Sequence, residues 1–444
     1  MSNFLPSRRR FLGQALATGI AAGFARRSWA QAGPLATTNE TIQAAHQAAL
    51  AVLQPSERDL RHGLALHAES IVFDSYGFAP RAAPDAAATN AAIEAGATAE
   101  ELTDLREEQT MLRYANDERE RKEFFESFTA AGVTCIFENA GEEGNDPLRL
   151  IKRLARYTYA TDVLKDVLPK AVRPGDVRRA KADGKICLAM TTNGVPLRHE
   201  WESVRDELRL VRIFHQLGVR MMHLTYNRRN PLGDGCGEPH DGGLSDFGRA
   251  AVAEMNRVGV IVDVAHTGWR TSREAAQASS KPMVASHTVC NGVHEHFRGK
   301  PDDTIKAICD TGGLVGVCCI PRFLGGKGDI SALLDHVDYL VKKFGPDHAA
   351  IGTDVAYISR NTKSEQDKIT KTKPAGAPRK GDGARWEHLW PDDDYRETAD
   401  AVKSIAWTNW PLFTVGLVQR GHSDDVIRKI LGENMLRVWT AQVQ

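Results

Sequence analysis

Short apolar runs recur along the chain, and each run ends in polar residues. Several runs are almost continuous in apolar residues, which is the pattern of strands covered on both faces. Amphipathic stretches with helical periodicity separate them, among them residues 204–217, 244–258 and 330–344. Strand and helix alternating eight times predict an α/β fold, a (β/α)8 TIM barrel with helical and loop insertions. The eight runs are Ile71–Phe73, Val133–Phe137, Ile186–Met190, Val219–Leu224, Val260–Val264, Met283–Ala285, Leu314–Cys319 and Ala349–Ile351.

Two segments interrupt this alternation. Residues 79–121 are Ala-rich and then acid-rich, which predicts a helical insertion after the first strand. Residues 359–395 are polar, are rich in Lys, Asp, Pro and Gly, and follow the last strand. Loops after barrel strands border the active site. The second insertion is therefore interpreted either as a lid or substrate-binding loop, or as a solvated surface excursion.

The N-terminus carries an export pattern. Residues 7–12 read Ser-Arg-Arg-Arg-Phe-Leu, as in twin-arginine leaders, and Ser28-Trp29-Ala30 fits a cleavage site. The weakly apolar run between them is shorter than the ~20 residues that cross a bilayer. We expect residues 1–30 to be a twin-arginine signal peptide, read by the twin-arginine export machinery, and residues 31–444 to form a single periplasmic barrel domain. The alternative is a basic N-terminal helix of the mature domain.

Charge and cysteine content exclude some partners. The 57 Lys and Arg balance the 57 Asp and Glu, so we expect neither a nucleic acid nor an anionic membrane surface as partner. No Cys directly follows the cleavage site and the C-terminus carries no apolar tail, so no membrane anchor is expected. The seven Cys form no paired motif, and an odd number leaves at least one thiol unpaired.

Polar residues follow the predicted strands, at the end of a TIM barrel where catalytic groups lie. A single His in such a place is usually structural, but two His at successive strand ends with an Asp at the last one are less ordinary. Neutral imidazole suits zinc and carboxylates complete such sites, so a metal site and a set of structural histidines both remain as interpretations. These polar residues are Asp74, Tyr76, Glu138, Thr192, Asn193, Tyr226, His266, His287 and Asp354.

Longer motifs surround these positions. They are GVRMMHLTYN (218–227), MNRVGVIVDVAH (255–266), PMVASH (282–287), Arg298 followed by PDD (301–303), IGTD (351–354) and GHSDDVIRKILGENMLR (421–437). Together they resemble motifs of the membrane (renal) dipeptidase family, peptidase family M19, which are amidohydrolase-like metallohydrolases. The similarity runs from about residue 66 to residue 440.

The resemblance carries expectations for single residues. It implies that His266 and His287 bind metal, that Arg298 contacts the substrate and that Asp354 is catalytic. Members of the family cleave dipeptides with two zinc ions that activate a shared water. The resemblance also favours a homodimer.

The chain departs from the family pattern at the first metal site. Tyr76 and Phe78 stand where the family has the metal-binding His and Asp of strand one, and Thr192 or Asn193 falls where it has a bridging Glu. Phe cannot bind a metal, and Tyr or Thr would be poor replacements. We therefore expect one zinc ion or none rather than two. Glu138 or Asp74 could supply the missing carboxylate, and Glu138 is the expected third ligand beside His266 and His287. The alternative is a structural pairing of Glu138 to an Arg.

Three readings of the function follow. The first is an exported metallohydrolase that cleaves a peptide or amide bond of a small peptide or peptide-derived substrate. In it Asp354 moves the proton, Arg298 pairs with a substrate carboxylate, and Tyr226, in the place of a family His, donates to the developing oxyanion. The second is a repurposed periplasmic protein that binds or matures a peptide-derived metabolite. A third reading keeps catalysis but changes the reaction to an isomerisation or lactone opening that uses Asp354 and Tyr76.

Overall fold

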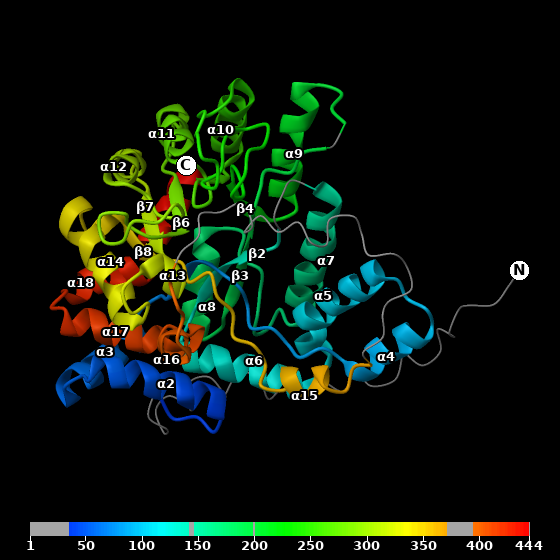
Figure 1. The fold of residues 1–444 in the computed structure, drawn as a ribbon, viewed down its shortest axis with the longest axis vertical. Helices are drawn as coiled ribbons and strands as arrows, with labels where there is room; N and C mark the ends of the chain where they lie inside the picture. The colour runs from blue at the N-terminus through cyan, green and yellow to red at the C-terminus, as the bar shows by residue number, and fades with distance from the viewer. Residues whose placement is uncertain (1–34, 142–145, 199, 371–393, 444) are drawn as a thin grey trace, which may run out of the picture.

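The computed structural model describes residues 35–141, 146–198, 200–370 and 394–443. Parallel strands β1 to β8 pair in the order of the chain, β1-β2-β3-β4-β5-β6-β7-β8, and helices cover the outside (Figure 1). This arrangement confirms the predicted (β/α)8 barrel. The strands are β1 (Phe73–Gly77), β2 (Cys135–Asn139), β3 (Cys187–Thr192), β4 (Val219–His223), β5 (Ile261–Asp263), β6 (Val284–Thr288), β7 (Leu314–Val317) and β8 (Ala349–Ile351).

The helices of the described residues pack around the barrel and at its two ends. Within them, no helix is both long and apolar enough to cross a membrane. The helices are α2 (Glu40–Leu53), α3 (Glu57–Glu69), α4 (Ala86–Glu94), α5 (Ala99–Asn116), α6 (Glu118–Ala131), α7 (Pro147–Val163), α8 (Pro174–Asp183), α9 (Val204–Gln216), α10 (Asp246–Val258), α11 (Trp269–Ala278), α12 (Asp302–Asp310), α13 (Pro321–Leu324), α14 (Ile330–Phe344), α15 (Thr362–Gln366), α16 (Ala399–Ser404), α17 (Trp410–Gln419), α18 (Asp424–Arg428) and α19 (Asn434–Val443).

The barrel interior is apolar toward the amino-terminal ends of the strands. Successive side chains of a strand point to opposite faces, so Cys135 and Phe137 of β2 fill the interior while Ile136 packs against the helices. Trp439 of the last helix, α19, closes this end, with its ring centroid 5.3 Å from that of Phe137. The polar residues of the strands therefore gather at the opposite, carboxyl-terminal end.

The expected elements mostly coincide with the observed ones. All eight strands lie at or next to the predicted runs, and the insertion at 79–121 contains α4, α5 and the start of α6, as expected. One difference is β1, which continues through polar residues to Gly77, so Asp74 and Tyr76 lie within the strand rather than after it. The expected leader, residues 1–30, and most of the second insertion, residues 371–393, lie outside the described residues.

Asp74 explains why β1 continues through polar residues. Its carboxylate accepts hydrogen bonds from the backbone N–H of Thr353 (2.9 Å), from the Thr353 hydroxyl (2.5 Å) and from Nε1 of Trp407 (3.1 Å). These three buried donors belong to segments that follow β8. Asp74 therefore ties the first strand to the last part of the barrel and is a structural residue.

Replacing Asp74 with alanine is expected to lower the free energy of unfolding by about 3 kcal/mol. The change leaves buried donors of Thr353 and Trp407 without an acceptor, and each such group typically costs about 1–3 kcal/mol. The shift of the urea unfolding midpoint measures the effect. Asp400→Ala on α16, whose side chain is 89% exposed, is the control and should change stability by less than about 0.5 kcal/mol. Equal midpoints for the two variants would contradict the structural role of Asp74.

Candidate functional site

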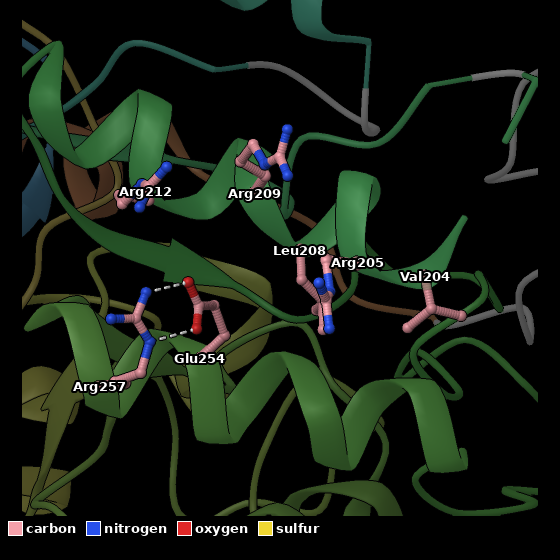
Figure 2. Close-up of a pocket in the computed structure, with 7 residues that line it drawn as sticks. All are labelled: Val204, Arg205, Leu208, Arg209, Arg212, Glu254 and Arg257. Carbon is pink, nitrogen blue, oxygen red and sulfur yellow. Dashed lines mark hydrogen bonds and ion pairs between the residues drawn. The ribbon is translucent and has the colours of Figure 1, made fainter. Parts of the chain in front are cut away.

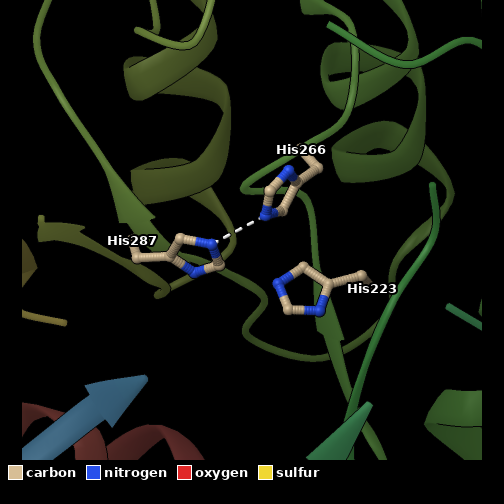
Figure 3. A group of neighbouring side chains, drawn as sticks. All are labelled: His223, His266 and His287. Carbon is tan, nitrogen blue, oxygen red and sulfur yellow. Dashed lines mark hydrogen bonds between the residues drawn. The ribbon is translucent and has the colours of Figure 1, made fainter. Parts of the chain in front are cut away.

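Three histidines converge at the polar end of the barrel. His223 ends β4, His266 lies in the turn after β5, and His287 lies in β6, and all three are buried. One ring nitrogen from each lies within 4.8 Å of the other two. Figure 3 shows the three rings gathered together. Nε2 of His266 and Nε2 of His287 are 2.8 Å apart. The group has the size of a binding site for one metal ion.

The orientation of each ring is set through its other nitrogen, Nδ1. Each Nδ1 is within hydrogen-bond distance of an oxygen, which lies on a neighbouring element for His223 and His266 and on the preceding residue for His287. Such an arrangement is common for metal-binding histidines. Amide and carbonyl oxygens can only accept, so the partners of His223 and His266 place a proton on Nδ1 and leave Nε2 with a lone pair. The partners are the carbonyl oxygen of Thr192 for His223 (2.6 Å), Oδ1 of Asn227 for His266 (2.7 Å) and Oγ of Ser286 for His287 (2.8 Å).

Two of the histidines are held neutral by their surroundings. Burial, followed by the positive charge of Arg298, holds the pKa of His266 and of His287 well below its usual range. Neutral imidazole is the form that binds metal ions. At neutral pH both rings are therefore available as ligands.

His223 lies beside a buried carboxylate. Its Nε2 is 2.9 Å from Oδ2 of Asp263, but the two atoms do not have the orientation of a hydrogen bond, and neither has a hydrogen-bond partner within the described residues. The other oxygen, Oδ1, accepts from the backbone N–H groups of Ala265 (3.0 Å) and Ser286 (3.1 Å). Burial would raise the pKa of Asp263, but His223 and Ser286 outweigh it and lower that pKa, so the carboxylate is ionised.

Arg298 places a positive charge against the histidines. Its side chain is 1% exposed, and its guanidinium donates to the carbonyl oxygens of Ala265 (2.5 Å) and His287 (3.3 Å). It also lies over the ring of Phe323, 5.5 Å from the centroid. No carboxylate of the described residues forms an ion pair with it. Burying an unpaired charge is costly, so this guanidinium is suited to bind an anionic group of a ligand.

Asp354 lies in the loop that follows β8 and is partly exposed. Its φ of 57° is in the left-handed region, where residues other than Gly are uncommon and often functional. Its backbone N–H donates to the carbonyl oxygen of Tyr76 (3.1 Å), which holds this conformation. Burial raises the pKa of the carboxyl to about 6, while Arg298 and His223 oppose the rise. Asp354 can therefore gain and lose a proton near neutral pH.

Two tyrosines cover the histidines. The ring of Tyr76 stacks on that of His287, with centroids 3.8 Å apart and planes 14° apart, and its hydroxyl donates to Oδ1 of Asn193 (2.7 Å). The ring of Tyr226 is partly exposed and lies 4.3 Å from that of His266. Tyr76 is thus fixed inside the barrel, whereas Tyr226 lies where a ligand can reach it.

The structure corrects the expected third ligand. The carboxylate of Glu138 accepts hydrogen bonds from the hydroxyl of Tyr157 on α7 and from the backbone N–H of Ala79, and it is not part of the histidine group. The reason is strand parity: Glu138 follows Phe137, which fills the barrel interior, so Glu138 points toward the helices. His223, not Glu138, completes the group with His266 and His287. The same parity could have found it, because Met221, two residues earlier, also faces inward.

A groove elsewhere on the molecule has different chemistry. It lies between α9 and α10, has a volume of about 630 Å³ and contains none of the three histidines (Figure 2). Arg205, Arg209 and Arg212 of α9 line one wall, and Glu254 neutralises Arg257 through two hydrogen bonds of 2.6 Å.

The seven cysteines are all buried and free, so none forms a disulfide.

The chain is similar to proteins of a known family. A family model described as membrane dipeptidase (peptidase family M19) matches residues 63–368. A dipeptidase of Aspergillus oryzae, aclJ, is 34% identical over 164 residues, which cover 36% of this chain and 39% of that protein. The match thus spans about two fifths of the length of this curated relative.

Solved structures share the fold over most of the chain. An amidohydrolase from Pseudomonas aeruginosa is 27% identical with a TM-score of 0.61, and the match covers 86% of this chain and 98% of that one. The probable dipeptidase PvdM from Pseudomonas aeruginosa has a TM-score of 0.59 over 87% of this chain and 98% of its own. It is 19% identical, so this likeness shows the shared barrel alone.

Proposed function

We propose, from the premise that this chain belongs to the membrane dipeptidase family (peptidase family M19), that it is a metal-dependent hydrolase cleaving a peptide or amide bond next to a free carboxylate. One observation carries the proposal. Arg298 is buried without a carboxylate partner among the described residues, and it donates to the carbonyl oxygen of His287, one of the three converging histidines. A small peptide or peptide-derived substrate would supply the missing negative charge.

The donor atoms fit a metal ion. His266 and His287 are neutral, their Nδ1 atoms are occupied, and their Nε2 atoms face each other at 2.8 Å. Imidazole nitrogens of this kind suit zinc. A zinc ion bound there would supply a Lewis acid that lowers the pKa of water and polarises a carbonyl group.

The number of ions follows from the residues around His287. Tyr76 stacks on this ring and packs edge-on against Phe78, with ring centroids 5.8 Å apart. These two aromatic side chains stand at the positions where the resemblance would require the ligands of a first metal. We therefore assign one zinc ion, not two, to the proposed enzyme.

The remaining site residues account for the other steps of hydrolysis. Arg298 would pair with the substrate carboxylate through two parallel hydrogen bonds and so fix the scissile bond beside the histidines. Asp354 would accept a proton from the attacking water as the new C–O bond forms, and would return it to the nitrogen as the C–N bond breaks. Tyr226 would donate a hydrogen bond to the developing oxyanion.

Zinc-dependent cleavage of simple dipeptides is the expected result for the purified protein. The release of free amino acids is measured by chromatography, with zinc added, and again after removal of the metal with a chelator. The proposal requires that chelation stops cleavage and that zinc restores it. Cleavage that is indifferent to the chelator, or the absence of cleavage with about one zinc bound per chain, would contradict it.

A second candidate is a pocket that binds a peptide-derived metabolite without hydrolysing it. The stacking of Tyr76 on His287 favours this alternative, because it fills with a fixed aromatic ring a position that the resemblance gives to a metal ligand. Calorimetric binding of an intact dipeptide, with no cleavage in the presence of zinc, would support this alternative over the hydrolase.

Export belongs to the proposal as well. The Ser-Arg-Arg-Arg-Phe-Leu pattern at residues 7–12 supports passage through the twin-arginine machinery into the periplasm. Cell fractionation of the full chain and of its Arg8→Lys, Arg9→Lys variant tests this. Retention of both proteins inside the cell would contradict it.

A homodimer, which the resemblance favours, is tested by light scattering of the purified protein.

A further inference from the structure

We propose that His223 is the third ligand of a single metal ion held by His223, His266 and His287, with the carboxylate of Asp263 beside it as counter-charge. This inference deepens the proposed function and rests on it only for the presence of a metal. Metal binding is measured without turnover, so the two can fail separately.

The first argument is the lone pair of His223. Its Nδ1 is 2.6 Å from the carbonyl oxygen of Thr192, which can only accept, so Nδ1 carries the proton. In the neutral ring Nε2 is then an acceptor, fully buried and without a hydrogen-bond partner in the described part of the chain. Such an atom needs a cation or a donor, because an unsatisfied buried polar group typically costs about 1–3 kcal/mol.

The second argument is that electron-rich atoms face one another in this group. Nε2 of His223 is 2.9 Å from Oδ2 of Asp263, and the Nε2 atoms of His266 and His287 are 2.8 Å apart. With every Nδ1 held by an oxygen partner, one divalent cation can satisfy all three rings and balance the carboxylate.

The third argument is the number of ligands. Catalytic zinc sites usually have three protein ligands and leave one position for water or substrate, and three histidines form one such set. Glu138 faces the helices and cannot complete the set. His223 comes from β4, between the strands that carry the lost bridging position and His266, so it compensates within the barrel for the missing carboxylate ligand.

The test compares zinc binding by the full chain and by two histidine variants. Stoichiometry is measured by elemental mass spectrometry and affinity by competition with a chelator. We expect one zinc per chain, and an affinity lowered more than ~100-fold by His223→Ala, beyond the ~10–100-fold typical for the loss of an outer partner. His336→Ala is the matched control: His336 is equally buried, but its nitrogens bond to the backbone of Cys290 and Leu324. It should keep wild-type zinc affinity.

X-ray absorption at the zinc edge gives a second readout. We expect three imidazole nitrogens for the wild type and two for the variant, with His223→Gln replacing His223→Ala if the latter does not fold. Unchanged zinc affinity in the His223 variants, two imidazoles in the wild type, or no zinc binding would each overturn the inference. One zinc on three imidazoles without dipeptide cleavage would leave the inference standing and overturn the hydrolase proposal.

Discussion

Replacing Asp354 with asparagine is expected to lower kcat/KM for dipeptide cleavage by ~10²–10⁴-fold, the usual contribution of a positioned general acid or base. The amide cannot accept the proton of the attacking water. The fold should survive, because Asn tolerates the left-handed φ of 57° that this position requires. Steady-state kinetics measure the loss, and a thermal melt compares the folds.

The pH profile separates proton transfer from a positional effect. The pKa of Asp354 is raised to about 6 by burial, against the opposing charge of Arg298. A base must be deprotonated, so kcat/KM of the wild type should fall as the pH decreases through this pKa and level off above it. This fall of kcat/KM at low pH is the acidic limb of the profile. In Asp354→Asn the acidic limb should disappear. Asp310→Asn on α12, an exposed pair with Lys306, is the control and should keep both rate and limb.

A small kinetic effect would count against the proposed role. A loss of less than about tenfold, with the acidic limb unchanged, would show that another group moves the proton. A large loss with an unchanged limb would give Asp354 a positional role. Only the loss of both rate and limb fits a residue that accepts the proton itself.

The barrel could be predicted because its signal is local. Runs such as Val260–Val264 are apolar on both faces, and the amphipathic stretches between them have the period of a helix. The start and end of β1 could not be read in this way. Asp74 and Tyr76 are polar residues inside a barrel strand, stabilised by partners more than 100 residues away, namely Thr353 and Asn193.

The site was predictable only where a residue lies just beyond a strand or matches a family motif. His266, His287, Arg298 and Asp354 met one of these conditions, and the structure brings the two histidines together and Arg298 against His287. His223 was missed because it is the last residue of its strand.

The prediction that Glu138 binds the metal was wrong, although it came from the same local pattern that predicted the strands correctly. The local pattern places Glu138 near the end of a strand but does not show which face of the strand it occupies. Phe137 occupies the interior, so the next residue must turn outward to Tyr157. Thr192, which orients the ring of His223, comes from another strand, and no local pattern in the sequence connects the two. For His287 the partner is the preceding residue, Ser286.

Replacing Arg298 with methionine is expected to lower kcat/KM for a dipeptide by ~30- to ~5,000-fold. This range corresponds to the about 2–5 kcal/mol typical for removing one partner of a buried, hydrogen-bonded charge pair. Methionine keeps much of the length of the side chain and its contact with Phe323, but not the charge. Arg257→Met, on α10 with a 60% exposed side chain, is the control and should leave kcat/KM unchanged.

A comparison of two substrates distinguishes substrate binding by Arg298 from a purely structural role of this residue. The guanidinium also donates to the backbone of Ala265 and His287, so its loss could disturb the histidines without any effect on substrate binding. The wild type should therefore prefer a dipeptide over its C-terminal carboxamide, and Arg298→Met should lose this preference while cleaving the carboxamide almost as well as the wild type does. Arg298→Lys, which keeps a charge but not the paired donors, should recover only part of the preference. An equal loss for both substrates would assign Arg298 to holding the histidines in place, because only an arginine that contacts the carboxylate can distinguish the two.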